Sequence, residues 1–328
     1  MKSKRQTANS KSNKGGTLFF LLRRRAQPSE FHFCPCRQLR LFAFCLLCAA
    51  FCLLPSSGFA QASPSVSWSP EKLINGAPCV FRYKPAMPLK SLRGSFLSKR
   101  IFFSFDQASG VWYSFAGVDY DTKPGNYDLG LNGETKNGQK ISFAQMVPIA
   151  KGYYRTTAIS VPKKYIDPDP ADVPRILQER DLKNEVLNRV TNSQWWTGNF
   201  VAPASLGTTS EFGSQRTYNG KRQSAHFGLD YGAGTGTPIR AINSGKVILA
   251  RDLYFEGNCV VIDHGQGLLS LYFHLSQFKI KEGDSVTKGQ LIALSGGTGR
   301  VTGPHLHLAV RWQGSYVNPA TLLGIKLP

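Results

Sequence analysis

The sequence predicts a mostly β protein made of two β-rich parts with a connecting helix between them. Three observations predict this class. Short apolar runs recur between Gly, Pro, Asn and Asp from residue 65 to about residue 162. One stretch with helical periodicity follows at residues 172–192. From residue 200 onward, β-like runs alternate with glycine-rich turns, and helical periodicity is almost absent.

Residues 1–62 have the features of a secretory signal peptide. A long basic leader precedes Leu41–Leu54, which is fourteen residues without a charge, and an Ala-Gln-Ala sequence ends at residue 62. The apolar run is shorter than the roughly twenty residues of a bilayer span. We therefore expect export to the periplasm or cell envelope, or to the extracellular space. The pattern leaves open whether the segment is cleaved or retained as an anchor.

Residues 63–162 are predicted to form a β-rich domain, either a small sandwich or a barrel. It contains no histidine and no catalytic arrangement of residues, so its aromatic side chains are interpreted as core. The β-like runs that carry this prediction are Cys79–Tyr83, Ile101–Phe105, Val111–Val118, Tyr127–Leu131, Ile141–Val147 and Tyr153–Val161.

Residues 163–195 are predicted to be a linker that contains a helix. Ile166–Pro170 carries two prolines and two aspartates, and Asp172 is the expected N-cap of a helix that ends near Asn192. We interpret its apolar side chains as one packing stripe rather than a partner site. That stripe is Ile176, Leu177, Leu182, Val186, Leu187 and Val190.

Residues 196–328 hold five of the six histidines of the chain, all between positions 226 and 307. His226 and Asp230 are expected on a strand that runs into a turn, where they share one face with Gly228. Phe227 and Leu229 would then lie in the core on the opposite face.

A second pair, His305 and His307, shares one face of a predicted strand, while Leu306, Leu308 and Val310 point the other way. Imidazole nitrogen and carboxylate oxygen are common zinc ligands, and a catalytic zinc site uses three protein ligands and leaves one position for water. An H-x-x-x-D motif followed by H-x-H offers this set with one histidine to spare. The alternative is that these are unconnected surface or core histidines.

Charge and cysteine content are informative about partners and compartment. The formal net charge is +20, of which residues 1–60 carry ten Lys/Arg against one acid, so residues 61–328 keep +11. This excess favours an anionic partner such as an envelope polymer or a membrane surface, and no nucleic-acid-binding motif is present. Five of the seven cysteines lie in the first 52 residues. Cys79 and Cys259 could pair in an oxidising compartment, but we expect two buried free thiols.

The motifs of residues 200–320 resemble those of the lysostaphin-type, or LytM, zinc metalloendopeptidases of bacterial cell walls. The resemblance implies an antiparallel β-sheet domain of the duplicated hybrid motif kind. The matching segments are Phe212-Gly213, Arg216, Asn219-Gly220, His226–Asp230, Gly236–Pro238, Gly245–Val247, Asp263–Gly265, Tyr272–Leu275, Gly283–Gln290 and Gly297–His307.

The resemblance also implies a role for each site residue. The zinc ligands, for one ion per chain, would be His226, Asp230 and His307. His274 and His305 would be the unligated catalytic pair, with a histidine serving as general base because no Glu stands in an H-E-x-x-H context. His264 lies in a turn of the family pattern and is interpreted as structural.

The implied activity is hydrolysis of the peptide cross-links of peptidoglycan by a zinc-activated water. Two alternatives stay open: a non-catalytic activator of other wall hydrolases, and a zinc peptidase that acts on proteins. Loss of a zinc ligand would mark the activator class, and none is lost here. The motifs do not identify the cleaved bond, the envelope type, the role of residues 63–162 or the oligomeric state.

Overall fold

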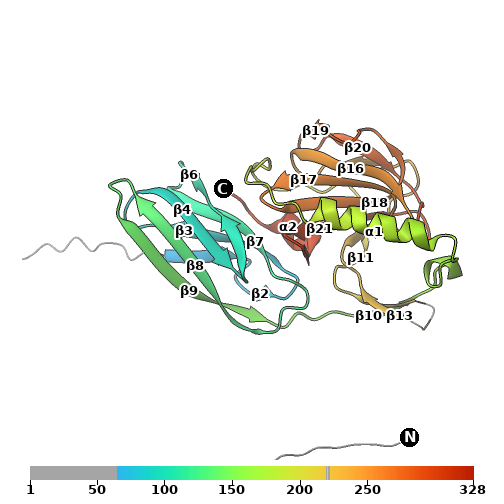
Figure 1. Ribbon diagram of the computed structural model, residues 1–328, viewed down its shortest axis with the longest axis horizontal. Coiled ribbons are helices and arrows are strands. Elements are labelled where there is room, and N and C mark those ends of the chain that lie inside the picture. The colour runs from blue at the N-terminus through green and yellow to red at the C-terminus, as the bar shows by residue number, and fades with distance from the viewer. Residues whose placement is uncertain (1–64, 219, 221) are drawn as a thin grey trace, which may run out of the picture. The chain divides into compact units, whose positions relative to one another are not determined.

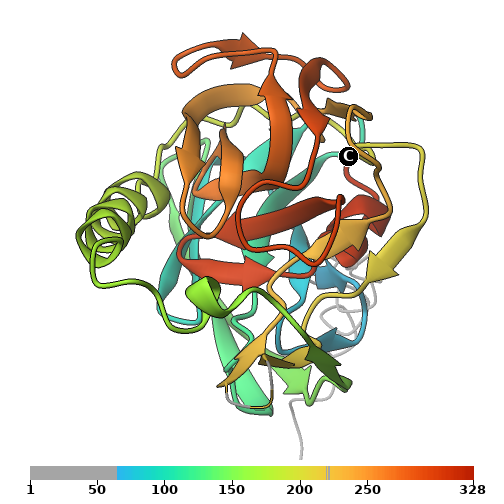
Figure 2. The same cartoon turned by 90° about the vertical axis from the view of Figure 1, so that its right-hand side faces the viewer.

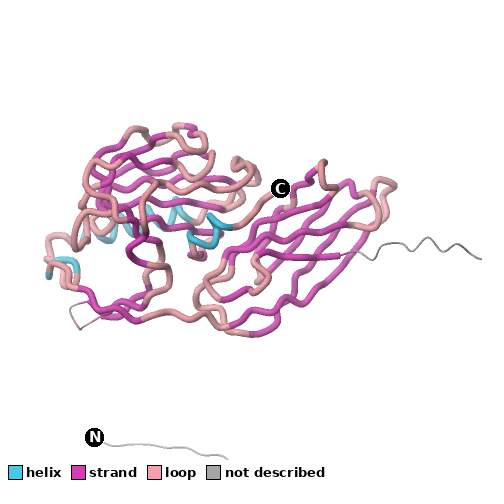
Figure 3. The backbone as a smooth tube through the Cα atoms, turned by 180° about the vertical axis from the view of Figure 1, so that it is seen from behind, coloured by secondary structure: helices cyan, strands magenta, loops and turns pink. Residues whose placement is uncertain are grey.

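Strands far outweigh helices in the described part of the chain, as Figure 3 shows, and the predicted mostly β class is confirmed. The computed structural model describes residues 65–218, 220 and 222–328. The predicted signal segment, residues 1–62, lies outside these described residues. Among the helices of the described part, none is long and apolar enough to cross a membrane.

The upstream part is a β-sandwich of two sheets (Figure 1), with strand orders β1-β3-β7-β6 and β2-β9-β8-β4-β5. All pairs are antiparallel except that of β2 with β9. Phe81 and Phe96, one from each sheet, meet edge to face with ring centroids 4.9 Å apart in the shared core. The strands are β1 (Ser65–Ser69), β2 (Leu73–Ile74), β3 (Pro78–Lys84), β4 (Leu89–Phe96), β5 (Lys99–Phe102), β6 (Ser104–Asp106), β7 (Val111–Gly117), β8 (Gly125–Thr135) and β9 (Lys140–Ala150).

The connecting segment contains a short 3₁₀ turn, η1 (Lys163–Tyr165), and the predicted helix, α1 (Val173–Leu187). The helix ends five residues before the expected Asn192, and the side chain of Asp172 at the N-cap position accepts no capping hydrogen bond. Its apolar stripe is also shorter than predicted, because Leu177 and Val190 are 43% and 44% exposed. Only the C-terminal half of α1 packs by apolar contact.

A three-stranded sheet follows, formed by β10 (Thr156–Ile159), β12 (Gln215–Tyr218) and β13 (Arg222–Ala225). The predicted strand Tyr153–Val161 is therefore reduced to its middle four residues. β10 runs parallel to β12, and β12 is antiparallel to β13. β10, which follows the sandwich in the chain, thus belongs to the same sheet as β13, which ends next to His226.

The C-terminal part is a ten-stranded antiparallel sheet, yellow to red in Figure 1, with the path β11-β14-β21-β18-β17-β16-β19. Off this path, β15 pairs with β20, β20 with β18, and β22 with β21. A short helix that was not predicted, α2 (Pro319–Gly324), follows the last strand. The strands are β11 (Thr208–Ser210), β14 (Leu229–Tyr231), β15 (Pro238–Arg240), β16 (Gly245–Leu253), β17 (Gly257–Gly265), β18 (Leu268–Phe278), β19 (Ser285–Val286), β20 (Leu291–Ser295), β21 (Leu306–Trp312) and β22 (Ser315–Val317).

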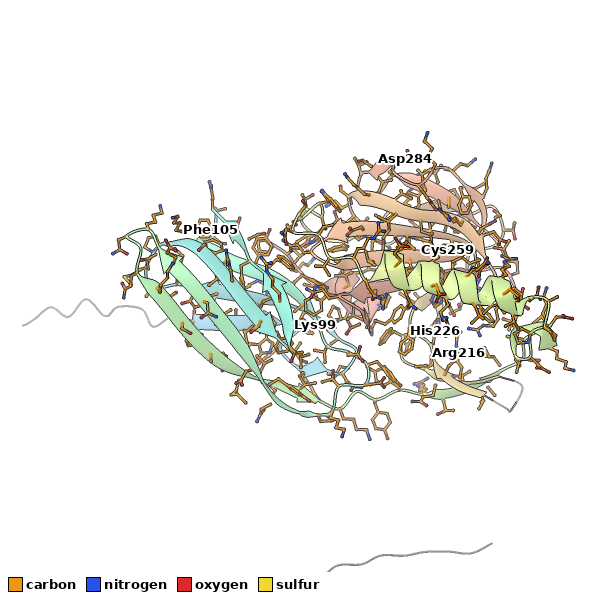
Figure 4. The ribbon with its side chains drawn as sticks, viewed as in Figure 1. Lys99, Phe105, Arg216, His226, Cys259 and Asp284 are labelled. Atoms are coloured by element: carbon orange, nitrogen blue, oxygen red, sulfur yellow. The ribbon has the colours of Figure 1, made fainter. Side chains whose placement is uncertain are left out.

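The two faces of β21 have different neighbours. Leu306, Leu308 and Val310 are fully buried in the main core, as the alternation predicted. Ala309, on the opposite face, packs in a second cluster with the C-terminal half of α1 and with Cys259. Figure 4 labels Cys259 beside α1. Because side chains two residues apart share a face, His307 lies on the same side of β21 as this cluster. Figure 2 shows α1, in green, beside the sheet.

The two cysteines of the described part are both free and buried, which confirms the prediction for Cys79 and Cys259. Burial raises the pKa of both thiols well above the ordinary range. They are inert core side chains, because a reactive cysteine needs an accessible thiolate.

Candidate metal centre and cleft

Strand pairing brings two of the predicted site residues together. β14 and β21 are antiparallel, and their register sets Asp230 directly opposite His307. The predicted strand over His226–Asp230 is wrong in its first half, because β13 ends at Ala225 and β14 begins only at Leu229. His226 therefore reaches the site from an irregular segment between two strands.

Gly228 lies in that irregular segment and permits the close approach of His307. A Cβ atom at position 228 would lie 2.3 Å from Nε2 of His307, which is far inside contact distance. Phe227 also differs from expectation. It lines the cleft and stacks on Tyr316 with ring centroids 5.1 Å apart, whereas Leu229 is core as predicted.

Three donor atoms converge at the centre of the site. Nε2 of His226 lies 2.9 Å from Oδ1 of Asp230 and 2.9 Å from Nδ1 of His307, and those last two atoms are 2.8 Å apart. All three side chains are largely buried, with exposed fractions of 2%, 8% and 12%. Within the described residues, these are the His, Cys, Asp or Glu side chains placed to hold a metal ion as a group of three.

The hydrogen bonds of His226 show why a cation fits this centre. Its Nδ1 lies 2.9 Å from the backbone carbonyl of Glu211, which can only accept, so Nδ1 carries the proton. In a neutral imidazole, Nε2 then presents a lone pair towards the oxygen of Asp230. A cation between the two atoms removes this repulsion, and zinc takes both nitrogen and carboxylate ligands.

Charge states at the centre agree with that arrangement. Burial by itself would raise the pKa of Asp230, but hydrogen bonds and attraction from His226 and His307 hold it well below its usual range. Burial lowers the pKa of His307 to about 4. Near neutral pH the centre thus offers one carboxylate and unprotonated imidazole nitrogen, the forms in which these groups bind metals.

Arg216 supports the centre from β12. Its Nη2 donates to Oδ2 of Asp230 at 2.8 Å and to Oγ of Ser210 at 2.7 Å, and the arginine side chain is 16% exposed. The pair leaves Oδ1 of Asp230 directed at His226 and His307. Figure 4 labels Arg216 next to His226. In the sequence, Arg216 stood out only as part of a family motif. Its contact with Asp230 could not be predicted, because it forms only when β12 folds close to β14.

His274 and His305 lie beside the centre with their rings 4.9 Å apart. Nδ1 of His274 donates to the carbonyl of Thr298 at 2.9 Å, and Nδ1 of His305 donates to the carbonyl of Gly303 at 2.8 Å. Each ring therefore keeps Nε2 free to accept a proton. Burial, reinforced by the neighbouring histidines, lowers the pKa of His274 to about 3. Nε2 of His305 is 3.8 Å from Oδ1 of Asp230.

His264 lies apart from the cleft and is structural, as the sequence indicated, but it lies on strand β17 and not in a turn as predicted. It is fully buried, with Nδ1 2.8 Å from the carbonyl of Ser244 and Nε2 2.7 Å from Oγ of Ser270. The carbonyl fixes the proton on Nδ1, so Nε2 accepts from the serine. Both ring nitrogens are therefore engaged in hydrogen bonds within the domain.

The centre opens into a cleft of about 650 Å³. Alternate residues of the segment around β10, which precedes the C-terminal sheet, contribute Thr157, Ile159 and Val161 to its wall. Arg300 also lines the cleft, with its guanidinium 5.1 Å from the ring of Phe255. The cleft is thus lined by apolar and basic side chains beside the three converging residues, His274 and His305.

A model of peptidase family M23 matches residues 224–319, which include the three converging residues, His274 and His305. Among curated proteins, the chain is 45% identical over 98 residues to the peptidoglycan DD-endopeptidase ShyA of Vibrio cholerae, covering 30% of this chain and 23% of that protein. It is 44% identical over 97 residues to the DD-carboxypeptidase/endopeptidase Mpg of Neisseria meningitidis, covering 30% and 22%. The matches thus span less than a quarter of these relatives.

A solved structure of an M23 peptidase from Pseudomonas aeruginosa resembles the chain over a larger part. The likeness has a TM-score of 0.58 at 27% sequence identity, and it covers 77% of this chain and 96% of that one. The shared fold therefore extends well beyond residues 224–319, into the part of the chain that the family model does not match.

Proposed function

Residues 224–319 form a peptidase family M23 domain, and from this we propose that the protein is a zinc-dependent endopeptidase that hydrolyses peptide cross-links of peptidoglycan. One observation carries the proposal. The three donor atoms of His226, Asp230 and His307 converge within 2.9 Å of one another, beside two histidines whose Nε2 atoms are free. The printed activities of the two curated relatives, a DD-endopeptidase and a DD-carboxypeptidase/endopeptidase, support the substrate class.

The zinc site would consist of Nε2 of His226, one carboxylate oxygen of Asp230 and Nδ1 of His307, for one ion per chain. When bound, the ion would supply Lewis acidity that polarises a peptide carbonyl and makes water easier to deprotonate. Gly303 fixes the proton of His305 on Nδ1, so Nε2 can take the proton of the attacking water. The same reasoning gives His274 a part in proton transfer or in stabilising the developing oxyanion.

The protein would act outside the cytoplasm, because its proposed substrate is an envelope polymer and the predicted signal segment implies export. The alternative of a non-catalytic activator gains no support, since the converging set of three residues and both further histidines are in place. No feature of the cleft favours proteins over wall peptides.

The direct test incubates the purified full chain, loaded with zinc, with purified peptidoglycan and in parallel with unfolded casein. We expect cross-linked muropeptides to be converted to monomers, activity to stop on chelation, and zinc to restore it. Mass analysis of the products identifies the cleaved bond. Hydrolysis of casein with intact muropeptides would instead assign the protein a proteolytic role, and no hydrolysis of either would overturn the proposal.

A further inference from the structure

Helix α1 lies on the same face of the C-terminal sheet as the metal centre, although it precedes the M23 match at residues 224–319. Val186 and Leu187 pack on the cluster that contains Ala309. Ala309 is two residues from His307 on β21, so α1 and the centre are neighbours on one surface. The helix is therefore placed to influence the site as well as to cover apolar residues.

Charged side chains of α1 hold the turn between β16 and β17. Glu179 is buried, and its carboxylate accepts from the backbone amide of Tyr254 at 2.8 Å. One turn of helix later, Nζ of Lys183 lies 2.7 Å from Oε1 of Glu256, with exposed fractions of 24% and 16% for the two side chains. Because both partners are largely shielded from water, removing one of them would leave the other charge poorly solvated.

The same turn holds His274. The backbone carbonyl of Glu256 accepts from the amide of His274 at 2.9 Å. His274 has φ of 63°, a left-handed conformation that a non-glycine residue adopts only where its surroundings impose it. Just after the turn, the amide of Asn258 in β17 donates to Oγ1 of Thr298 at 2.9 Å, and the carbonyl of Thr298 accepts from Nδ1 of His274.

Glu256 itself borders the cleft, so the contact that Lys183 makes with it lies close to the site. Within the described residues, its second carboxylate oxygen, Oε2, is buried without a hydrogen-bond partner. Lys183 is thus the cation that compensates this carboxylate. Without Lys183, a charge that is expensive to bury would remain unpaired, and the turn would have to move to hydrate it.

We propose that Lys183 is a positioning residue for the reaction: through Glu256 it fixes the turn that holds His274 in its strained conformation beside the centre. This inference rests on the proposed hydrolase function. It also means that α1, which lies outside the M23 match, contributes to the geometry of the active site. A shift of about 1 Å in a catalytic group can lower the rate of the chemical step by about 100-fold.

The test compares Lys183→Met with Arg180→Met in the full chain. Arg180 is on the same helix, and its pair with Asp181 is exposed, at 60% and 66%. With a soluble cross-linked muropeptide, we expect Lys183→Met to lower kcat by about 10- to 100-fold with little change in KM and an unchanged zinc content. Arg180→Met should behave as the wild type, and Lys183→Arg should regain most of the lost kcat.

A double-mutant cycle with Glu256→Gln tests whether the effect runs through Glu256. If it does, the kcat of the double variant should be little lower than that of the less active single variant, because both substitutions break the same contact. The inference would be overturned if the loss of kcat in the double variant equalled the product of the two single losses. It would also be overturned by a Lys183→Met variant with wild-type kcat. If Lys183→Met does not fold, the same comparison is made with Lys183→Gln. An inactive wild type would instead count against the proposed function.

Discussion

At the residue scale, backbone carbonyls decide the chemistry of the histidines. The backbone carbonyls of Glu211, Thr298 and Gly303 each accept a hydrogen bond from Nδ1 of a site histidine, so in the neutral ring Nε2 carries no proton. For His226, Nε2 faces the other two converging atoms. For His274 and His305, it is free for proton transfer. Because the backbone engages the same atom, Nδ1, in all three rings, the division between ligand and proton acceptors is set by where each ring places its Nε2.

This division gives the first prediction. Replacing His226, Asp230 or His307 by Ala should remove bound zinc and activity together. The His274→Ala and His305→Ala variants should keep about one zinc per chain and lose about 100-fold or more in rate, because they remove proton transfer and charge stabilisation only. Zinc content at saturating metal and muropeptide release would be measured for all five variants.

Two outcomes would change this assignment. If the His305 variant bound no zinc and the His307 variant still bound it, the roles of the two histidines would have to be exchanged. If all five variants hydrolysed peptidoglycan normally, the proposed enzymatic function would be excluded.

Arg216 provides the second prediction. Its 2.8 Å contact with Oδ2 of Asp230 orients the carboxylate, and partners of this kind typically contribute about 10- to 100-fold to metal affinity. Arg216→Met should weaken zinc binding by that factor in competition with a chelator, with the fold retained. The matched control is Arg240→Met, whose guanidinium donates to the carbonyl of Gly289 away from the centre. Equal zinc affinity in both variants would contradict the role.

His264 provides the third prediction, on stability. Burial lowers its pKa from the ordinary 6.5 to about 4. The unfolded chain binds a proton below about pH 6.5, but the folded chain binds it only below about pH 4. The free energy of unfolding therefore falls as the pH drops through this window, by at most about 3 kcal/mol from this residue.

Urea unfolding without metal would be followed from about pH 7 to about pH 4.5. The wild type should lose more stability over this range than His264→Asn, whose side chain does not titrate. Parallel slopes for the two proteins would show that His264 is not neutral in the folded state.

At the scale of elements, residues outside the M23 match complete the site. β10 supplies one wall of the cleft, and α1 holds the turn that contacts His274. Neither element carries a catalytic side chain. Both nevertheless determine how much room a substrate has and how firmly the histidines are held.

The element at the N-terminus gives the fourth prediction. If the apolar run Leu41–Leu54 and the Ala-Gln-Ala ending direct export, the mature protein should begin near Gln61 or Ser63. N-terminal sequencing of the protein from envelope fractions of its host would measure this. An intact leader in those fractions would show an anchored protein, and recovery from the cytoplasm alone would contradict export.

At the scale of the whole molecule, charge governs the first encounter with the wall. Residues 61–328 carry a net formal charge of +11. Attraction between exposed charges is screened beyond about 8–10 Å near physiological ionic strength, so binding to peptidoglycan sacculi should weaken as salt rises. Sedimentation with sacculi across a salt series would measure it. Binding that holds steady at high salt would indicate recognition by shape and hydrogen bonds instead.

Local periodicity in the sequence determined the mostly β class and the alternation of β21. Donor chemistry singled out His226, Asp230, His305 and His307. The sequence offered His274 only through the family resemblance. It did not reveal β4, whose buried Leu89, Leu92 and Phe96 follow no period of two because the pairing with β8 shifts register between Leu89 and Ser91.

Only the tertiary structure decided the rest. The strand predicted at His226 is an irregular segment, because a close approach to His307 requires Gly228 without a side chain. The roles of Arg216, Lys183 and Glu256 depend on contacts across 14 and 73 residues of chain. Such contacts have no local signal, since they exist only after strands and a helix from separate segments have packed on one sheet.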